Sequence, residues 1–147
     1  MENIILEKVG VKDWEKVLFF EKSCTCYVYH SIVKEEELKD YIRDNEVYFI
    51  ILEDKKVGTI SYECKDNVAH FNGLTVLPEY RGRGIATFVM KKILSELKEF
   101  NEASLDVHPE NSSAIVVYLK SGFVIKKWNA NLFGEGEHRL FLVKNLN

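Results

Sequence analysis

The sequence has few cysteines, and their number and spacing restrict the kinds of protein it encodes. Its three cysteines are Cys24, Cys26 and Cys64, in a chain of 147 residues. An odd number without framework spacing is typical of reduced thiols, so we expect a cytoplasmic protein without a disulfide scaffold. Cys24 and Cys26 are too closely spaced and too isolated to form a metal knuckle, and we expect no metal site.

Long apolar runs and a strong charge imbalance are also missing. No window approaches 18 uncharged apolar residues, which argues against a transmembrane helix and a membrane partner. The segment MENIILEKVG lacks a basic start followed by a long apolar run, so we expect no secretory signal. The 20 basic and 23 acidic residues give a net charge of −3, which argues against a nucleic-acid partner.

What is present is the composition of a globular protein, with 46% hydrophobic and 29% charged residues, and the length predicts one domain over residues 1–147. Hydrophobic periodicity and turn signals predict the elements of this domain. The expected helices span 12–24, 33–45, 84 to about 100, and 110–122. The expected strands span 3–9, 67–76, 103–108, 123–128 and 138–145, with a hairpin in 46–64 around a turn at Asp54-Lys55-Lys56. This order predicts a mixed α/β domain with a largely antiparallel sheet.

Local signals refine the ends of these elements. Asp13 is expected to cap the first helix, and Asn111 and Gly122 to begin and end the last one. A glycine inside a strand usually marks a bulge, so Asn72-Gly73 predicts one in its strand. The apolar face expected for the third helix consists of Ile85, Val89, Ile93 and Leu97.

The stretch LTVLPEYRGRGIATFVMKKIL, residues 74–94, passes from a strand into a helix through two arginines and two glycines. The first turn of a helix has unpaired N–H groups and a partial positive charge. Glycine lets the backbone approach a ligand closely, and arginine adds bidentate contacts to phosphate. The segment 81–86 therefore predicts a site for phosphate or pyrophosphate, with a plain turn carrying exposed arginines as an equal alternative.

A second pattern follows further along the chain, at the start of the last helix. Asn111, Ala114 and Tyr118 have the spacing of one helix face, and the small alanine leaves room for a ligand there. Tyr118 would then offer a leaving group a phenol with a pKa of about 10. The alternative interpretation places Tyr118 in the core beside Val117 and Leu119.

Together the two segments resemble the GNAT superfamily of acyl-CoA-dependent N-acetyltransferases. The family signature Arg/Gln-x-x-Gly-x-Gly/Ala is matched by Arg81, Gly84 and Ala86. Its downstream pattern of Asn, Ala, Tyr and Gly-Phe is matched by Asn111, Ala114, Tyr118 and Gly122-Phe123. The resemblance covers residues 71–123. It implies a six- to seven-stranded sheet flanked by about four helices, with a fourth strand that splays from the fifth.

This resemblance implies acetyl-CoA as the cosubstrate, bound where the two strands splay apart. The pantetheine arm would pair with the backbone of Leu74, Thr75 and Val76, and an N–H near Val76 would polarise the acyl carbonyl. Asn111 would contact the cofactor arm, and Tyr118 would protonate the departing thiolate as general acid. The pyrophosphate would rest on the turn made by Arg81, Gly82, Arg83, Gly84, Ile85, Ala86 and Thr87.

In some family members the catalytic base is a glutamate on the fourth strand, and this chain has His70 at that position. Histidine has a pKa near 6.5, which suits a base at neutral pH. Glu63 on the preceding strand is another candidate base, as is a relayed water that Asn72 would order. An ordinary strand histidine is a further interpretation of His70.

The first two helices usually shape the acceptor pocket in this family, and the segment 26–30 lies between them. We therefore expect Tyr27, Tyr29 and His30 to bind the acceptor, together with Asn72. His108, after the fifth strand, is either a further substrate contact or a solvated turn residue.

The leading hypothesis is an N-acetyltransferase that moves an acetyl group from acetyl-CoA to a primary amine of a small molecule, peptide or protein. The amine would attack the thioester directly in a ternary complex, and the protein would be a monomer or a homodimer. A non-catalytic acyl-CoA-binding or sensory module is the second hypothesis. A nucleotide-phosphate binder that uses only the glycine–arginine turn is the third, and the downstream pattern argues against it.

Overall fold

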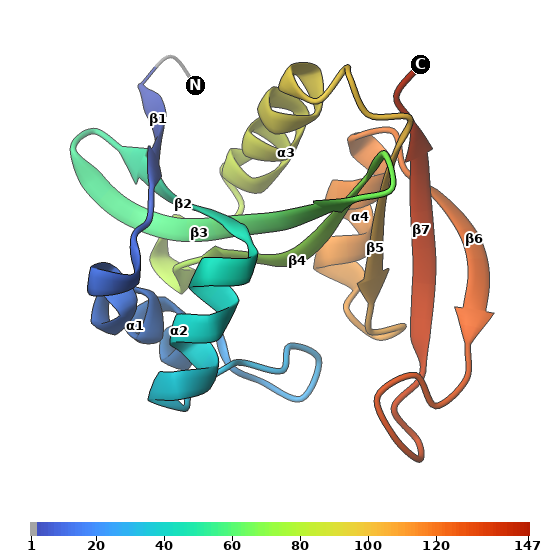
Figure 1. Ribbon diagram of the computed structural model, residues 1–147, viewed down its shortest axis with the longest axis horizontal. Coiled ribbons are helices and arrows are strands. Elements are labelled where there is room, and N and C mark those ends of the chain that lie inside the picture. The colour runs from blue at the N-terminus through green and yellow to red at the C-terminus, as the bar shows by residue number, and fades with distance from the viewer. Residues whose placement is uncertain (1–2) are drawn as a thin grey trace.

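A computed structural model describes residues 3–147, which form one seven-stranded sheet and four α-helices (Figure 1). Met1 and Glu2, at the start of the expected amino-terminal segment, lie outside the described residues. The strands are β1 (Ile4–Lys8), β2 (Glu46–Leu52), β3 (Lys55–Lys65), β4 (Val68–Val76), β5 (Glu102–Val107), β6 (Val124–Asn129) and β7 (Arg139–Asn145). The helices are α1 (Trp14–Cys24), α2 (Glu35–Asp44), α3 (Ile85–Glu96) and α4 (Ser112–Lys120), with short 3-10 turns η1 (Val11–Asp13) and η2 (Pro78–Tyr80).

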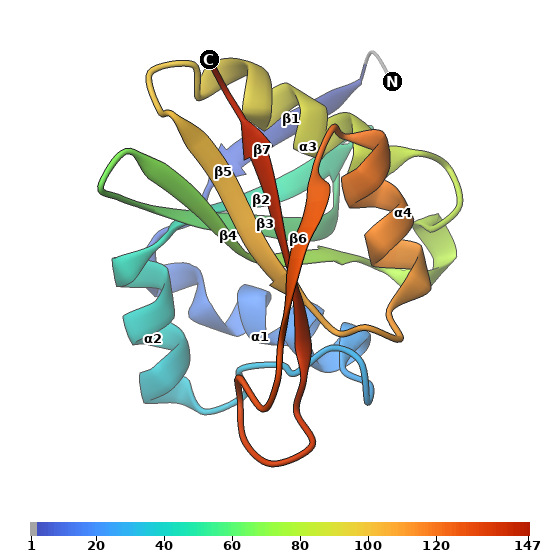
Figure 2. The same cartoon turned by 90° about the vertical axis from the view of Figure 1, so that its right-hand side faces the viewer.

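The helices cover both faces of the sheet, with α1 and α2 on one face and α3 and α4 on the other (Figure 1, Figure 2). The larger core lies on the α3 side and includes Phe71 and Leu105 of the sheet. A smaller core joins α1 and α2 to β2. The apolar face expected for α3 is confirmed, because each of its members is buried: Ile85, Val89, Ile93 and Leu97.

The strand order is β1-β2-β3-β4-β5-β7-β6, and the predicted sequence of elements is confirmed. Neighbouring strands are antiparallel except β4 and β5, which run parallel. A parallel pair needs a crossover connection, and α3 provides it. The predicted bulge is also confirmed, because Ser61 pairs with Gly73 and Tyr62 with Phe71, which leaves Asn72 as the extra residue of β4.

The ends of α4 agree with the sequence prediction. The side chain of Asn111 caps the helix by accepting a hydrogen bond from the Ala114 N–H at 3.3 Å. Gly122 adopts φ +98°, a left-handed conformation that favours glycine, and the next N–H, of Phe123, returns to the carbonyl of Tyr118 at 3.0 Å.

Three local predictions were wrong. The β2–β3 turn is made by Glu53 and Asp54, both with positive φ, so Lys55 already belongs to β3. A two-residue turn of this kind matches the twist of the two strands, which a three-residue turn at 54–56 does not. At the amino end of α1, Asp13 occupies the cap position, but its carboxylate accepts from the Gly10 N–H at 3.3 Å instead of capping the helix.

The third helix also ends earlier than expected. α3 stops at Glu96, whereas the periodicity predicted a helix to about Phe100. The Leu97 side chain stays in the core, but its backbone leaves the helical conformation, and the Phe100 N–H bonds the Leu97 carbonyl in a tight turn. That turn redirects the chain into β5. Within residues 3–147, no helix has the length and apolar character needed to cross a membrane.

Candidate functional site

The two parallel strands at the centre of the sheet separate part of the way along. β4 pairs with β5 from Val68 to Phe71, opposite residues 102–105, and β4 then continues to Val76 alongside β3. Among the strand pairings of residues 3–147, none joins 72–76 to β5. The splayed fourth and fifth strands are therefore confirmed, and the bulge at Asn72 lies where the separation begins.

The three β4 residues beyond the bulge are held firmly from the β3 side. Leu74 and Val76 pack against the larger core, and Thr75 is buried. The Thr75 hydroxyl accepts the Thr59 N–H at 3.0 Å and lies 2.7 Å from the Thr59 hydroxyl. This part of β4 is therefore a fixed strand that offers its other edge to a ligand.

The glycine–arginine turn lies between η2 and α3. Gly82 and Gly84 adopt φ +76° and φ +79°, which residues with side chains rarely take. The first bond of α3 runs from the Phe88 N–H to the Gly84 carbonyl at 3.0 Å. The preceding N–H groups, those of Ile85, Ala86 and Thr87, thus have no acceptor within the helix and form its electropositive start.

The two arginines of this turn are ordered by the backbone. Arg81 Nε donates to the Val76 carbonyl at 2.8 Å, and Arg83 donates to the Glu79 carbonyl at 3.2 Å and lies over the Tyr80 ring. Both residues keep exposed surface, as do Gly82 and Gly84. The turn therefore presents cationic groups beside a helix start at the open end of β4.

Helix α4 brings Tyr118 to the α3 side of the sheet. Its ring meets Phe123 edge-on, with centroids 6.0 Å apart, and it packs against the larger core. Desolvation raises the pKa of Tyr118 to about 12, although part of its surface stays accessible. The phenol is consequently a protonated donor at neutral pH. Asn111, predicted to contact the cofactor arm, caps the same helix.

The candidate bases His70 and Glu63 face each other across β3 and β4. His70 Nδ1 lies 2.8 Å from the Ser104 hydroxyl, and His70 Nε2 lies 3.5 Å from Asp106 Oδ2. Both ring nitrogens therefore have partners on β5, which fixes the ring orientation. Glu63 accepts a hydrogen bond of 3.2 Å from the side chain of Asn72, the bulge residue.

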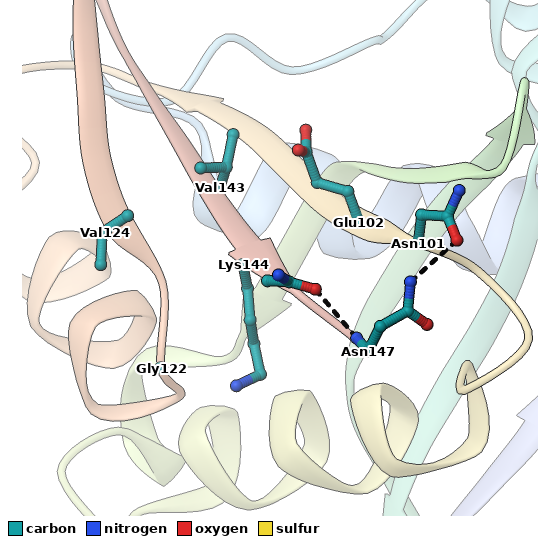
Figure 3. Close-up of a pocket in the computed structure, with 8 residues that line it drawn as sticks. Asn101, Glu102, Gly122, Val124, Val143, Lys144 and Asn147 are labelled. Atoms are coloured by element: carbon teal, nitrogen blue, oxygen red, sulfur yellow. Dashed lines mark hydrogen bonds between the residues drawn. The ribbon is translucent and has the colours of Figure 1, made fainter.

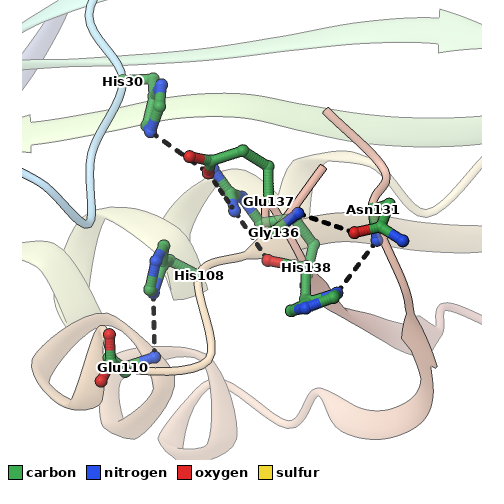
Figure 4. Close-up of polar contacts among 8 residues, drawn as sticks. His30, His108, Glu110, Asn131, Gly136, Glu137 and His138 are labelled. Carbon is green, nitrogen blue, oxygen red and sulfur yellow. Dashed lines mark hydrogen bonds and ion pairs between the residues drawn. The ribbon is translucent and has the colours of Figure 1, made fainter. Parts of the chain in front are cut away.

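The three predicted acceptor residues of the α1–α2 loop point in different directions. The Tyr27 side chain is 72% exposed and meets the His108 ring edge-on at 5.9 Å. His30 Nε2 lies 3.5 Å from Glu137 Oε2 on the β6–β7 connection, as Figure 4 shows. These contacts bring three loops from distant parts of the sequence together at one end of the sheet.

Tyr29 turns inward instead. Its hydroxyl donates to Glu21 Oε1 at 3.3 Å, and Glu21 is only 3% exposed. The sequence analysis did not find Glu21, although a signal was present. Glu21 shares the buried stripe of α1 with Val17, Phe20 and Cys24, a pattern in which a carboxylate is out of place.

An open hollow lies elsewhere on the molecule, near the carboxyl end (Figure 3). It has a volume of about 580 Å³ and is lined by residues that include Asn101, Gly122 and Lys144. None of the candidate catalytic residues lines it. Within residues 3–147, no cluster of three or more His, Cys, Asp or Glu side chains has the arrangement to hold a metal ion.

The sheet has a single parallel pair that opens beside a glycine–arginine helix start, which is the arrangement implied by the resemblance to the GNAT superfamily of acetyltransferases. The sequence matches the Acetyltransferase (GNAT) family over residues 11–123, which is more than half of the chain, and the chain belongs to this family. Enzymes of this family use acetyl-CoA as cosubstrate and act on amine acceptors.

Two relatives carry names consistent with this family. An uncharacterized N-acetyltransferase of Methanocaldococcus jannaschii is 31% identical over 100 residues, which cover 58% of this chain and 44% of that protein. The N-alpha-acetyltransferase MAK3 of Arabidopsis thaliana is 29% identical over 113 residues, covering 66% of this chain and 60% of that protein. The chain thus spans less than two thirds of the length of either relative.

Solved structures share the fold along almost the whole chain. The ribosomal-protein-S18-alanine N-acetyltransferase from Escherichia coli superposes with a TM-score of 0.83 at 14% identity, covering 98% of this chain and 94% of that one. A spermidine/spermine N-acetyltransferase from Vibrio cholerae superposes with a TM-score of 0.78 at 15% identity, covering 99% and 94%. At such identities the likeness establishes the fold.

Proposed function

We propose that this protein transfers an acetyl group from acetyl-CoA to a primary amine of a small molecule, peptide or protein, by direct attack in a ternary complex. The observation that carries the proposal is the separation of β4 from β5 after Phe71, with the 81–87 turn at its open end. The relatives and structural neighbours described above are named as N-acetyltransferases, which supports this reaction class.

The described residues fit the cosubstrate that the family uses. The N–H groups at the start of α3 and the positive-φ backbone of Gly82 and Gly84 suit a pyrophosphate, which needs close backbone approach. The edge of residues 74–76 that is not paired with β5 suits an extended arm that pairs like a strand, and on this edge the Val76 carbonyl is already bonded to Arg81. Acetyl-CoA supplies the thioester carbonyl that the amine attacks, and a backbone N–H near Val76 is proposed to stabilise the charge developing on that oxygen.

Tyr118 is proposed as the general acid. Because its desolvated phenol has a pKa of about 12, it stays protonated at neutral pH and is able to give a proton to the departing thiolate. Asn111 is proposed to place the start of α4 against the cofactor arm while it caps the helix.

His70 is proposed to assist the acceptor amine as a base or through an ordered water, with Glu63 as the alternative. His70 is supported by its fixed ring, and Glu63 by its hydrogen bond to Asn72 at the bulge. Tyr27, Tyr29, His30 and Asn72 are proposed to surround the acceptor, because the α1–α2 loop bends over this end of the sheet (Figure 1).

Residues 1–147 are further proposed to act as one domain in the cytoplasm, as a monomer or a homodimer. A Vibrio cholerae spermidine N-acetyltransferase with the same fold is described as dodecameric, so assembly occurs on this fold. Size-exclusion chromatography with light scattering tests the oligomeric state directly.

Thiol release from acetyl-CoA across a panel of amines tests the function. The panel should contain polyamines, peptides with free amino termini and peptides with internal lysines. Acceptor-dependent release, slowed about 100-fold in Tyr118→Phe, is the expected result. Tight acetyl-CoA binding without release for any amine would instead support the non-catalytic sensory module.

A further inference from the structure

A group of polar side chains lies under the bulge of β4, on the face covered by α1 and α2. Tyr29 donates to Glu21 Oε1 at 3.3 Å, and the Tyr41 and Ser61 hydroxyls are hydrogen-bonded to each other. A Cβ placed on Gly73 would lie 2.8 Å from the Tyr41 hydroxyl, 3.3 Å from that of Ser61 and 3.4 Å from that of Tyr29. Three hydroxyls therefore converge on the first β4 residue after the bulge.

The carboxylate behind these hydroxyls is incompletely paired. Glu21 is only 3% exposed, and among the described residues its Oε2 has no hydrogen-bond partner. A buried carboxylate with an unpaired oxygen destabilises a fold unless it is neutral or serves a ligand. Burial raises the pKa of Glu21 to about 7, and the Tyr29 hydroxyl, followed by the Ser31 hydroxyl and the Ile32 N–H, offsets part of that rise.

Other ionisable groups surround this carboxyl from several elements. Tyr41 of α2 and Tyr29 of the loop face it, and each has its pKa raised mainly by burial and further by the charge of Glu21. Cys24 lies one turn further along α1. The pKa of its thiol is raised by burial and also by the charge of Glu21, while Arg81 offsets part of that rise. The pKa of Tyr29 is also raised slightly by Tyr118, the proposed general acid.

We propose that Glu21 accepts the proton of the acceptor ammonium through the hydroxyl of Tyr29, a step that rests on the proposed function. The Tyr29 oxygen lies beside Gly73, where β4 has just left β5 and where a nucleophile would approach the thioester. Glu21 itself is buried on α1 and does not touch the amine. It is a positioned proton acceptor that acts through the phenol.

The protons balance along this route. Tyr29 takes one proton from the ammonium while passing its own proton to Glu21, and the neutral amine attacks the carbonyl carbon. The C–S bond breaks, the thiolate takes a proton from Tyr118, and the second nitrogen proton restores that phenol. Glu21 then returns its proton to solvent, so one ammonium and one thioester give one amide, one thiol and one released proton.

The pH dependence of kcat/KM tests this role, with Glu15→Gln as the matched control on an exposed position of the same helix. Wild type and Glu15→Gln should show an acidic limb with a midpoint near 7. Glu21→Gln should lose that limb, and its kcat/KM at neutral pH should be about 100-fold lower, a typical effect of losing proton transfer. Tyr29→Phe should lower kcat/KM to a similar extent while its affinity for acetyl-CoA stays unchanged. Glu21→Asp should restore part of the acidic limb.

Two results would overturn the inference. A Glu21→Gln enzyme that keeps the acidic limb, while His70→Ala loses it, would assign the base to His70 and leave the proposed function intact. A carboxyl NMR titration that places the pKa of Glu21 near 4.5 in the wild type would show that Glu21 is not the group behind an acidic limb near 7. Absence of acetyl transfer by the wild type to any amine is a different outcome, because it removes the proposed function itself.

Discussion

Arg81 Nε donates to the carbonyl oxygen of Val76 at 2.8 Å, and this bond ties the glycine–arginine turn to the open end of β4. The buried Cys24 thiol approaches the same carbonyl from α1 at 3.6 Å. Strand, turn and first helix are thus fixed to one another at the point where the cosubstrate is proposed to bind. The free edge of β4 and the N–H groups of α3 are held in one relative position before any ligand arrives.

Replacement of Arg81 tests this connection. Arg81→Ala removes both the bond to Val76 and a cation beside the proposed pyrophosphate, and charge-assisted contacts of this kind contribute roughly 1.5–3 kcal/mol each. We expect acetyl-CoA affinity to fall about 10- to 100-fold in isothermal titration calorimetry. Arg43→Ala on α2, which removes an exposed arginine paired with Asp40, is the control and should bind normally.

The glycines of the turn allow a second matched comparison. Gly82 and Gly136 have nearly the same φ, +76° and +79°, and a Cβ at either would meet nothing within 4 Å. Alanine at either position should therefore cost roughly 1–2 kcal/mol of unfolding free energy for its left-handed conformation. Only Gly82→Ala should also weaken acetyl-CoA binding, because its methyl group would enter the space proposed for the pyrophosphate. Equal affinities in the two variants would argue against that site.

Tyr118→Phe separates catalysis from cofactor binding. The ring and its contact with Phe123 remain, so acetyl-CoA affinity should change little. Loss of the donor should lower kcat about 100-fold, in the range of general acid catalysis. Because the pKa of Tyr118 is about 12, the phenol should contribute no basic limb to kcat below about pH 10. A basic limb below that pH that disappears in Tyr118→Phe would show that the site is more polar than the structure indicates.

The buried Glu21 predicts a dependence of stability on pH that needs no activity measurement. Its pKa is raised from 4.5 in the unfolded chain to about 7 in the fold, so the folded state holds its proton longer. The contribution of this group to the free energy of unfolding is therefore largest below pH 4.5 and decreases as the pH rises to about 7. The total loss is roughly 3 kcal/mol, from about 1.4 kcal/mol per pKa unit.

Urea unfolding of wild type and Glu21→Gln across this pH range measures the effect. Glutamine does not titrate, so the free energy of unfolding of Glu21→Gln should increase relative to that of the wild type between pH 4.5 and 7. The difference should then stay constant above pH 7. Glu15→Gln on the exposed face of α1 should show no such trend. A constant difference between wild type and Glu21→Gln across the range would mean that the buried carboxyl has an ordinary pKa.

Local sequence determined most of the architecture, because periodicity and turn chemistry act over short distances. The apolar spacing of α3, the Asn111 cap and the Asn72-Gly73 bulge are all in the structure as predicted. The family resemblance added the splayed strands. Only the ends of elements were misplaced. Periodicity does not show that the two residues Glu53 and Asp54 are enough to form the β2–β3 turn, nor that the backbone leaves the helical conformation at Leu97.

The relations between distant residues required the tertiary structure. Glu21, Tyr29, Tyr41, Ser61 and Gly73 come from five separate parts of the chain, and only packing of α1 and α2 against β3 and β4 brings them together. Arg81 and Val76 were both assigned to the cofactor site from the sequence, but their bond depends on how η2 folds back. The sequence by itself therefore determined the family, because its motifs are local. Tertiary packing decided which buried groups face the proposed acceptor site, because their desolvation and contacts exist only in the folded chain.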